Sequence, residues 1–187
     1  MKEYQHLLSR AVSFFWETRN SQIKKQEING TTDAGNRWAV TWGKQMDGFL
    51  EFFKVFTIDL WVPEKYIHIR ENTLPLYFRP SKNWDLLIIS PNRKLIACLE
   101  LKSQVGSFWN NFNNRTEEAI WNAVDIWTAF RENTFPNQQA PFVGYVMIAE
   151  KTEKSSKAIR LSKAHFPILN EFNNTSYLDR YKIFCQK

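Results

Sequence analysis

Three charged side chains near the middle of the sequence, Asp85, Glu100 and Lys102, have the types and spacing of a metal-dependent site. Glu100 and Lys102 alternate with leucines, so an extended strand places both of them on one face. If Asn92 and Arg93 form a two-residue turn, the hairpin places Asp85 directly across from Glu100. Two carboxylates and a lysine then converge at one end of the hairpin.

The chemistry of this trio follows from its charges. Adjacent carboxylates repel each other, and a shared hard cation relieves the repulsion, so Asp85 and Glu100 are the predicted ligands of Mg²⁺. Such a metal polarises a phosphodiester and lowers the pKa of a bound water, while Lys102 orients that water or stabilises the developing charge. A surface hairpin with ordinary charges is the competing interpretation, because an acid upstream of Glu-x-Lys is common by chance.

Hydrophobic periodicity predicts the elements that must position this hairpin. We expect one domain over residues 1–187 with an α/β fold, in which a mixed sheet is flanked by helices. Pro75 and Pro80 indicate an irregular connection before the hairpin, and Trp127 is expected in the core. The predicted helices are 3–26, 44–56 and 116–131, the hairpin strands are 84–89 and 95–102, and 142–149 is a buried strand.

Composition narrows the class of protein. The chain has 25 Lys+Arg against 19 Asp+Glu, and its net charge of +6 weakly favours a polyanionic partner. No apolar run approaches the length of a membrane span. Cys98 and Cys185 cannot form a disulfide framework, so a reducing cytoplasm is the expected location. Cys98 itself has the features of a small strand residue rather than of a nucleophile.

The trio lies within longer segments that have a recognisable pattern. These segments are 44–49, 78–80, 84–86, 100–108, 110–120, 125–131 and 141–144. Asp85 and the Glu100-Leu101-Lys102 triplet resemble the PD-(D/E)xK nuclease motif, with Trp84 in place of the motif's proline. Together with the flanking segments they resemble the XhoI family of type II restriction endonucleases, nearly end to end.

The resemblance implies a PD-(D/E)xK restriction-endonuclease-like core and Mg²⁺-dependent double-strand cleavage of a short palindrome. Familiar members cut CTCGAG, act as homodimers on double-stranded DNA and are paired with a DNA methyltransferase in a restriction-modification system. Family members continue beyond the equivalent of residues 185–187, so we expect this chain to lack a C-terminal segment. Two other functions stay open: a structure-selective repair or recombination nuclease, and a DNA-binding relative that has lost cleavage.

Further site residues are predicted around the trio. Asp47 lies on the preceding helix, where nucleases of this motif often place an acid for a second metal, although Glu51 competes for that role and a solvated helix face explains either. Gln104 extends the strand face of Lys102 and is predicted to touch the metal-bound water or DNA.

Other residues are candidates for DNA contact. Residues 110–118 are expected to form a loop that leads into a helix, from which Asn113, Asn114 and Arg115 reach a groove. The alternative is a helix cap in which Arg115 pairs with Glu118. Predicted DNA contacts also include Lys44 and two lysines of the basic run 151–163, Lys154 and Lys157, against the alternative of a solvated loop.

The balance of glycine and tryptophan is unusual, with 6 Gly and 8 Trp. Five tryptophans fall where the family pattern carries glycine, and we hypothesise that UGA codons for glycine were read as tryptophan. If the tryptophans are genuine, we expect overpacking at ~1–3 kcal/mol per site and a poorly folded or inactive enzyme. The codons and the mass of the native protein test the hypothesis. The five positions are Trp38, Trp42, Trp61, Trp109 and Trp121.

Overall fold

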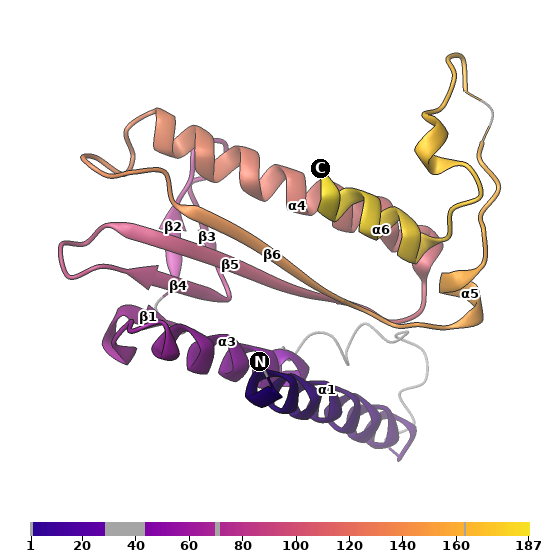
Figure 1. Cartoon of the computed structure of the whole chain (residues 1–187), viewed down its shortest axis with the longest axis horizontal. Coiled ribbons are helices and arrows are strands. Elements are labelled where there is room, and N and C mark those ends of the chain that lie inside the picture. Colours follow the sequence, from indigo (N-terminus) through magenta and orange to yellow (C-terminus); the bar gives the residue numbers. More distant parts are fainter. Residues whose placement is uncertain (1, 29–43, 70–71, 163) are drawn as a thin grey trace.

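The structure of the chain is a computed structural model that describes residues 2–28, 44–69, 72–162 and 164–187. It contains helices, short 3-10 helices (η) and strands in a mixed order, as Figure 1 shows. In chain order these are α1 (Lys2–Ile28), η2 (Lys44–Met46), α3 (Asp47–Asp59), η3 (Glu64–Tyr66), β1 (Ile67–His68), β2 (Thr73–Pro75), β3 (Ser81–Asn83), β4 (Leu86–Ile89), β5 (Leu95–Gln104), α4 (Phe108–Arg131), β6 (Phe142–Ala149), α5 (Glu153–Ser156), η4 (Asn170–Phe172) and α6 (Tyr177–Gln186).

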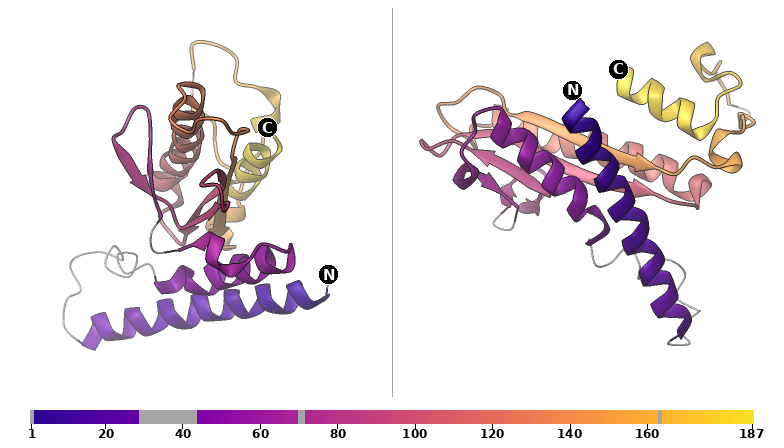
Figure 2. Two further views of the ribbon diagram at one scale, coloured as in Figure 1. Left: turned by 90° about the vertical axis from the view of Figure 1, so that its left-hand side faces the viewer. Right: turned by 60° about the horizontal axis from the view of Figure 1, so that its bottom comes forward.

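The main sheet has the strand order β1-β4-β5-β6 and is mixed. β4 pairs antiparallel with β1 and β5, whereas β6 runs parallel to β5 after the α4 crossover. Helices α1 and α3 cover one face of the sheet, and α4 and α6 lie on the other (Figures 1 and 2). The predicted fold class, a mixed sheet flanked by helices with a restriction-endonuclease-like core, is confirmed.

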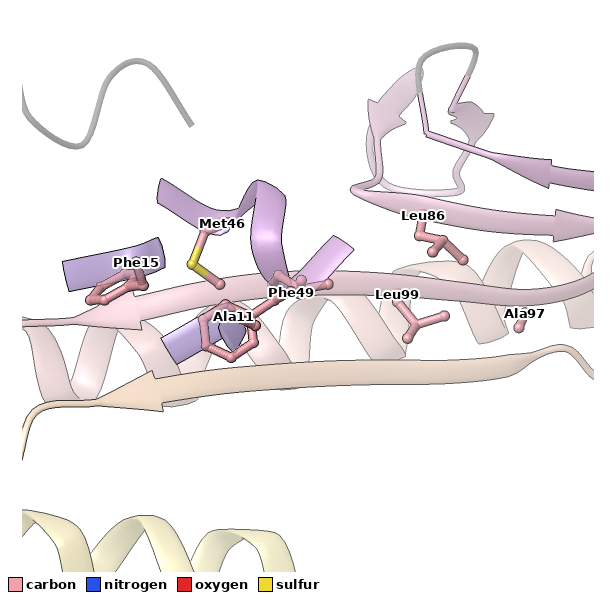
Figure 3. Packing of buried hydrophobic residues seen from close by; sticks show 8 residues of the cluster. Ala11, Phe15, Met46, Phe49, Leu86, Ala97 and Leu99 are labelled. Atoms are coloured by element: carbon pink, nitrogen blue, oxygen red, sulfur yellow. The ribbon is translucent and has the colours of Figure 1, made fainter. Parts of the chain in front are cut away.

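The core under α1 and α3 is formed by the odd-numbered side chains of β5. Leu99 and Leu101 belong to one buried cluster with Phe15 of α1 and Phe49 of α3. Figure 3 labels Phe15, Phe49 and Leu99 of this cluster. Gly48 lets the two helices approach closely, because a Cβ at this position would lie 3.1 Å from Ala11 Cα. Apolar residues therefore occupy this face of β5, and the even-numbered charged residues are left on the other face.

A second core lies on the opposite face, where Trp84 and Cys98 pack with Ile126 of α4. Two burial predictions on this side are wrong. Trp127 is 43% exposed, because it lies one position beyond the buried Ile126 on the helix. β6 is only half-buried, because it is an edge strand of the sheet. Among the described residues, no helix has the length and apolar character to cross a membrane.

The hairpin between β4 and β5 has the predicted register but not the predicted turn. Ser90 N–H donates to Lys94 O, so the turn has three residues, and Arg93 takes a left-handed φ of 56°. A register shift at Ile88/Ile89 then compensates for the extra residue. Leu86 consequently pairs with Leu99, as expected from a two-residue turn.

The end of α3 has the backbone of a glycine-terminated helix. Trp61 takes a φ of 65° directly after the helix, Trp61 N–H donates to Ile58 O, and Val62 N–H donates to Thr57 O. These two bonds define a Schellman motif, in which the left-handed residue is usually glycine. The Trp61 side chain is 94% exposed, so its packing contributes little stability to offset the strain of the left-handed backbone.

We expect the Trp61→Gly variant to be more stable than the parent protein by about 1 kcal/mol. A left-handed conformation costs a residue with a Cβ roughly 1–2 kcal/mol, and the greater chain entropy of unfolded glycine offsets part of that gain. The free energy of unfolding from urea titration measures the difference. Trp121→Gly is the matched control, because Trp121 is also exposed but lies in the middle of helix α4, where glycine should instead destabilise by about 0.5–1 kcal/mol. A destabilised Trp61→Gly protein would contradict the assignment.

The described tryptophans do not support the expectation of overpacking. Trp109 is 71% exposed and Trp121 is 59% exposed, so both project from α4 without crowding a core. Trp38 and Trp42 lie outside the described residues. The expectation that these residues are too bulky for the fold is therefore wrong at the three described positions, and among those three only Trp61 has a backbone that favours glycine.

Candidate active site

The position of Asp85 is fixed by backbone bonds at the start of β4. Its N–H donates to Leu99 O at 3.0 Å, which continues the antiparallel ladder by one residue. Its Oδ2 accepts a hydrogen bond from Leu101 N–H at 2.6 Å, so the carboxylate is held against β5. The other carboxylate oxygen is left for a further partner. Asp85 is thereby brought beside Glu100, as the sequence predicted.

Glu100 is the central carboxylate of the site and is only 3% exposed. Lys102 Nζ donates to Glu100 Oε1, which confirms that the two side chains share a face of β5. Lys82 Nζ lies 2.6 Å from Glu100 Oε2, and this lysine comes from β3 in the separate two-stranded sheet. Sequence reasoning missed Lys82, because it expected an irregular connection there; its proximity to Asp85 in the chain was the only available signal.

The first half of α4 adds a third carboxylate. Glu118 Oε1 lies 3.4 Å from Lys102 Nζ, and its Oε2 accepts from Arg115 at 2.7 Å and from the Tyr145 hydroxyl at 3.3 Å. The predicted loop at 110–118 is wrong, because α4 already begins at Phe108. The alternative pairing of Arg115 with Glu118 is confirmed.

Burial and charge shift the pKa values of these groups in ways that matter for catalysis. Burial raises the pKa of Asp85, the Leu101 N–H lowers it, and the charge of Glu100 raises it further. Burial works to lower the pKa of Lys102, but Glu100, Glu118 and Asp85 outweigh it and raise the pKa above its ordinary value. Lys102 is thus a protonated ammonium at neutral pH, suited to stabilise negative charge rather than to accept a proton.

The donor set fits a hard divalent cation. Asp85 and Glu100 supply carboxylate oxygens on one face, and Mg²⁺ is commonly held by one or two carboxylates, with waters and substrate phosphates completing its shell. Within the described part of the chain, no group of three or more His, Cys, Asp or Glu side chains is arranged to hold a metal. Asp85 and Glu100 by themselves therefore do not form an all-protein metal cage.

Two predicted site residues lie apart from this cluster. Asp47 begins α3, which covers the odd-numbered face of β5, so the sheet separates it from Glu100. Burial raises the pKa of Asp47 and Lys44 lowers it. Because α3 packs on the opposite face of the sheet from the trio, no described contact joins Asp47 to Glu100, and its role as an acid for a second metal stays a prediction.

Gln104 is on the predicted face but is fully buried. Its amide nitrogen donates to the Gly106 and Ser107 carbonyls, and its Oε1 accepts from the Tyr181 hydroxyl at 2.8 Å. These contacts join the end of β5 to α6. The Gln104 side chain is thus hydrogen-bonded within the protein, which disagrees with the predicted contact with DNA or a metal-bound water.

Of the remaining predicted DNA contacts, Arg115 is linked to Lys102 through Glu118, and the others lie at the surface apart from the trio. Asn113 and Asn114 are exposed on the early turns of α4, whereas Arg115 is half-buried in its pair with Glu118. Lys154 and Lys157 are exposed at α5. Lys44 is exposed in η2. All of these contacts stay predictions.

Asp125 anchors the segment that carries Lys82. Its Oδ1 accepts from Tyr77 N–H and Phe78 N–H, each at 2.9 Å, and its Oδ2 accepts from Arg79 Nε at 2.8 Å. These bonds attach the turn between β2 and β3 to helix α4. The hairpin is thereby held where its second strand presents Lys82 to Glu100.

Cys98 lies on the same strand face but takes no part in this chemistry. It is fully buried in the second core, and burial raises its pKa to about 12. A thiol in this state is not a nucleophile at neutral pH. The prediction that Cys98 is a small strand residue agrees with this placement.

A mixed sheet flanked by helices, with Asp85 beside Glu100 and Lys102, defines a nuclease of the restriction-endonuclease-like class. The family description "Restriction endonuclease XhoI" matches residues 25–187. The chain therefore belongs to the XhoI family of restriction endonucleases. No solved structure matches it.

Curated relatives support the same class. Type II restriction enzyme XhoI of Xanthomonas vasicola is 41% identical over 191 residues, which cover 100% of this chain and 76% of that enzyme. BstVI of Geobacillus stearothermophilus is 45% identical over 161 residues, or 83% of this chain and 72% of the relative. AbrI of Azospirillum brasilense is 42% identical over 169 residues, or 89% and 75%. The chain is a restriction endonuclease, and its substrate class is DNA.

Proposed function

We propose that this chain is a cytoplasmic type II endonuclease that uses Mg²⁺ to cut both strands of a short palindromic DNA site, with CTCGAG as the candidate sequence. The observation that carries the proposal is the convergence of Asp85, Glu100 and Lys102 on one face of the β4–β5 hairpin. The identity of 41–45% to named type II restriction enzymes supports the class of reaction.

The residues divide the chemistry between them. Asp85 and Glu100 would hold the metal, which when bound polarises the phosphodiester and increases the acidity of a water. Lys102, protonated and held by Glu100 and Glu118, places a positive charge beside the reacting phosphate and stabilises the charge that develops there. The hydrogen bond from Leu101 N–H to Oδ2 keeps the Asp85 carboxylate oriented against β5.

A palindromic site is matched by a two-fold symmetric enzyme, so the proposal includes a homodimer and a protecting methyltransferase. Helix α4 offers a candidate surface for the second copy. Its exposed face carries Ile120, Trp121, Val124 and Trp127, an apolar stripe at helical spacing. Exposed lysines near α5 and η2 are the proposed phosphate contacts.

The function is tested with purified protein and supercoiled plasmids that differ only in one CTCGAG site. We expect linear product from the plasmid that carries the site, in the presence of Mg²⁺ and not of EDTA. Discrete fragments at a different sequence would keep the enzyme class and reject CTCGAG. Cutting confined to branched DNA would favour the repair nuclease. Retention of DNA without cutting would favour the cleavage-deficient relative.

A further inference from the structure

We propose that Lys82 is an internal counter-cation of the metal site, which occupies Glu100 in the metal-free protein and withdraws from it when a divalent cation binds. This inference rests on the proposed function, because it takes Glu100 as a metal ligand. It adds a residue that lies outside the Asp, Glu-x-Lys trio and comes from a separate hairpin.

The contacts of Glu100 carry the first step. Lys102 holds Oε1 and Lys82 holds Oε2, so both oxygens of the carboxylate are occupied by ammonium groups. A metal ion at Glu100 would lie close to two ammonium groups, and the withdrawal of one lysine would relieve their repulsion. Lys102 is also held by Glu118 at 3.4 Å and shares the strand of Glu100, so it stays beside the carboxylate.

Lys82 has other favourable contacts that remain when its ammonium group moves away from Glu100. It belongs to β3, not to the strand of Glu100, and its Nζ already has a second acceptor in the Asn83 carbonyl at 3.0 Å. The same Nζ lies 4.9 Å from the centre of the Trp84 ring, which stabilises a cation through its face. The ammonium can therefore release Glu100 while it keeps two favourable contacts.

The balance of charge gives the reason for such a lysine. Counted by formal charge, Asp85, Glu100 and Glu118 carry three negative charges and Lys82, Lys102 and Arg115 carry three positive charges, so the formal charges of the metal-free cluster sum to zero. A divalent cation would add two charges to a site where Glu100 is 3% exposed and Lys82 has a side chain only 13% exposed. Withdrawal of Lys82 reduces that excess, and its presence keeps the buried carboxylates compensated before the metal arrives.

The test is a Mg²⁺ titration of the full chain without DNA, followed by NMR at two sites. The Leu101 amide, which donates to Asp85, reports metal binding, and the Trp84 indole, whose ring lies beside Lys82 Nζ, reports the movement of Lys82 away from Glu100. We expect Lys82→Met to bind Mg²⁺ about tenfold more tightly than the parent, because a competing charge within hydrogen-bond distance is removed. In the parent, the Trp84 indole signal should shift together with the Leu101 amide.

Lys65→Met is the matched control, because Lys65 also lies over an aromatic ring, that of Tyr66 at 5.1 Å, but belongs to η3 and not to the candidate site. It should bind Mg²⁺ as the parent does. Lys82→Gln, which keeps a polar group and removes the charge, provides a second variant if Lys82→Met folds poorly. Equal or weaker Mg²⁺ affinity in the Lys82 variants overturns the role of Lys82 alone. Absence of any Leu101 shift in every protein overturns the metal proposal as well.

Discussion

Glu100→Gln is expected to reduce the rate of DNA cleavage by at least about a thousandfold while DNA binding persists. The substitution keeps the shape of the side chain and removes the charge that is proposed to hold the metal and that pairs with Lys82 and Lys102. Loss of metal-assisted charge stabilisation is worth several kcal/mol in the transition state, and each ~1.4 kcal/mol changes the rate tenfold. Single-turnover cleavage of a labelled duplex measures the effect.

The DNA affinity and the folding of the Glu100→Gln protein must be measured alongside its cleavage rate. Fluorescence anisotropy with the duplex should give a dissociation constant within a fewfold of the parent value, and circular dichroism should report a folded protein. Glu132→Gln is the control, because Glu132 is exposed at the end of α4, away from the trio. Full cleavage activity in Glu100→Gln would remove Glu100 from the metal site.

Asp125→Ala is expected to lower the free energy of unfolding by about 2–4 kcal/mol. The carboxylate is buried and accepts hydrogen bonds from Tyr77 N–H, Phe78 N–H and Arg79. Its removal leaves two backbone donors without their partner and breaks an ion pair, and losses of this kind cost roughly 1–3 kcal/mol for each buried group. Urea unfolding followed by circular dichroism gives the change.

The contribution of Asp125 should also depend on pH. Burial works to raise its pKa, but the bonds from Arg79, Phe78 and Tyr77 outweigh it and hold the pKa below the ordinary value. The folded state therefore favours the ionised form, and the stabilisation is present above the unfolded pKa of about 3.9 and is lost as the pH falls through the folded value. Asp125→Asn should remove that part of the acid sensitivity. An unchanged pH dependence would show that the carboxylate is not stabilised in this way.

The hydrogen bonds of Asp125 connect the stability of the protein to the geometry of the candidate active site. Because Asp125 holds the turn between β2 and β3, its loss should also loosen the strand that presents Lys82 to Glu100. A local effect of this kind appears in Asp125→Ala as a changed Trp84 indole resonance, since Lys82 lies over that ring.

The sequence alone determined the trio and most of the elements around it. Alternation of leucines with Glu100 and Lys102 fixed the face of β5, since side chains on a strand alternate with a period of two. The predicted position of Asp85 is correct although the predicted length of the turn is wrong, because the register shift at Ile88/Ile89 restores the pairing of β4 with β5. The spacing of apolar residues predicts the buried face of an element when that element buries one face, as both α1 and β5 do.

Only the tertiary structure decided which distant residues meet the trio. Lys82 reaches Glu100 because Asp125 of α4 holds its hairpin, a contact between segments that are far apart in the chain. Gln104 faces α6 and Asp47 lies behind the sheet, although their positions in the sequence suggested the site. Spacing along the chain specifies the face of an element, whereas packing of one element against another specifies what that face contacts.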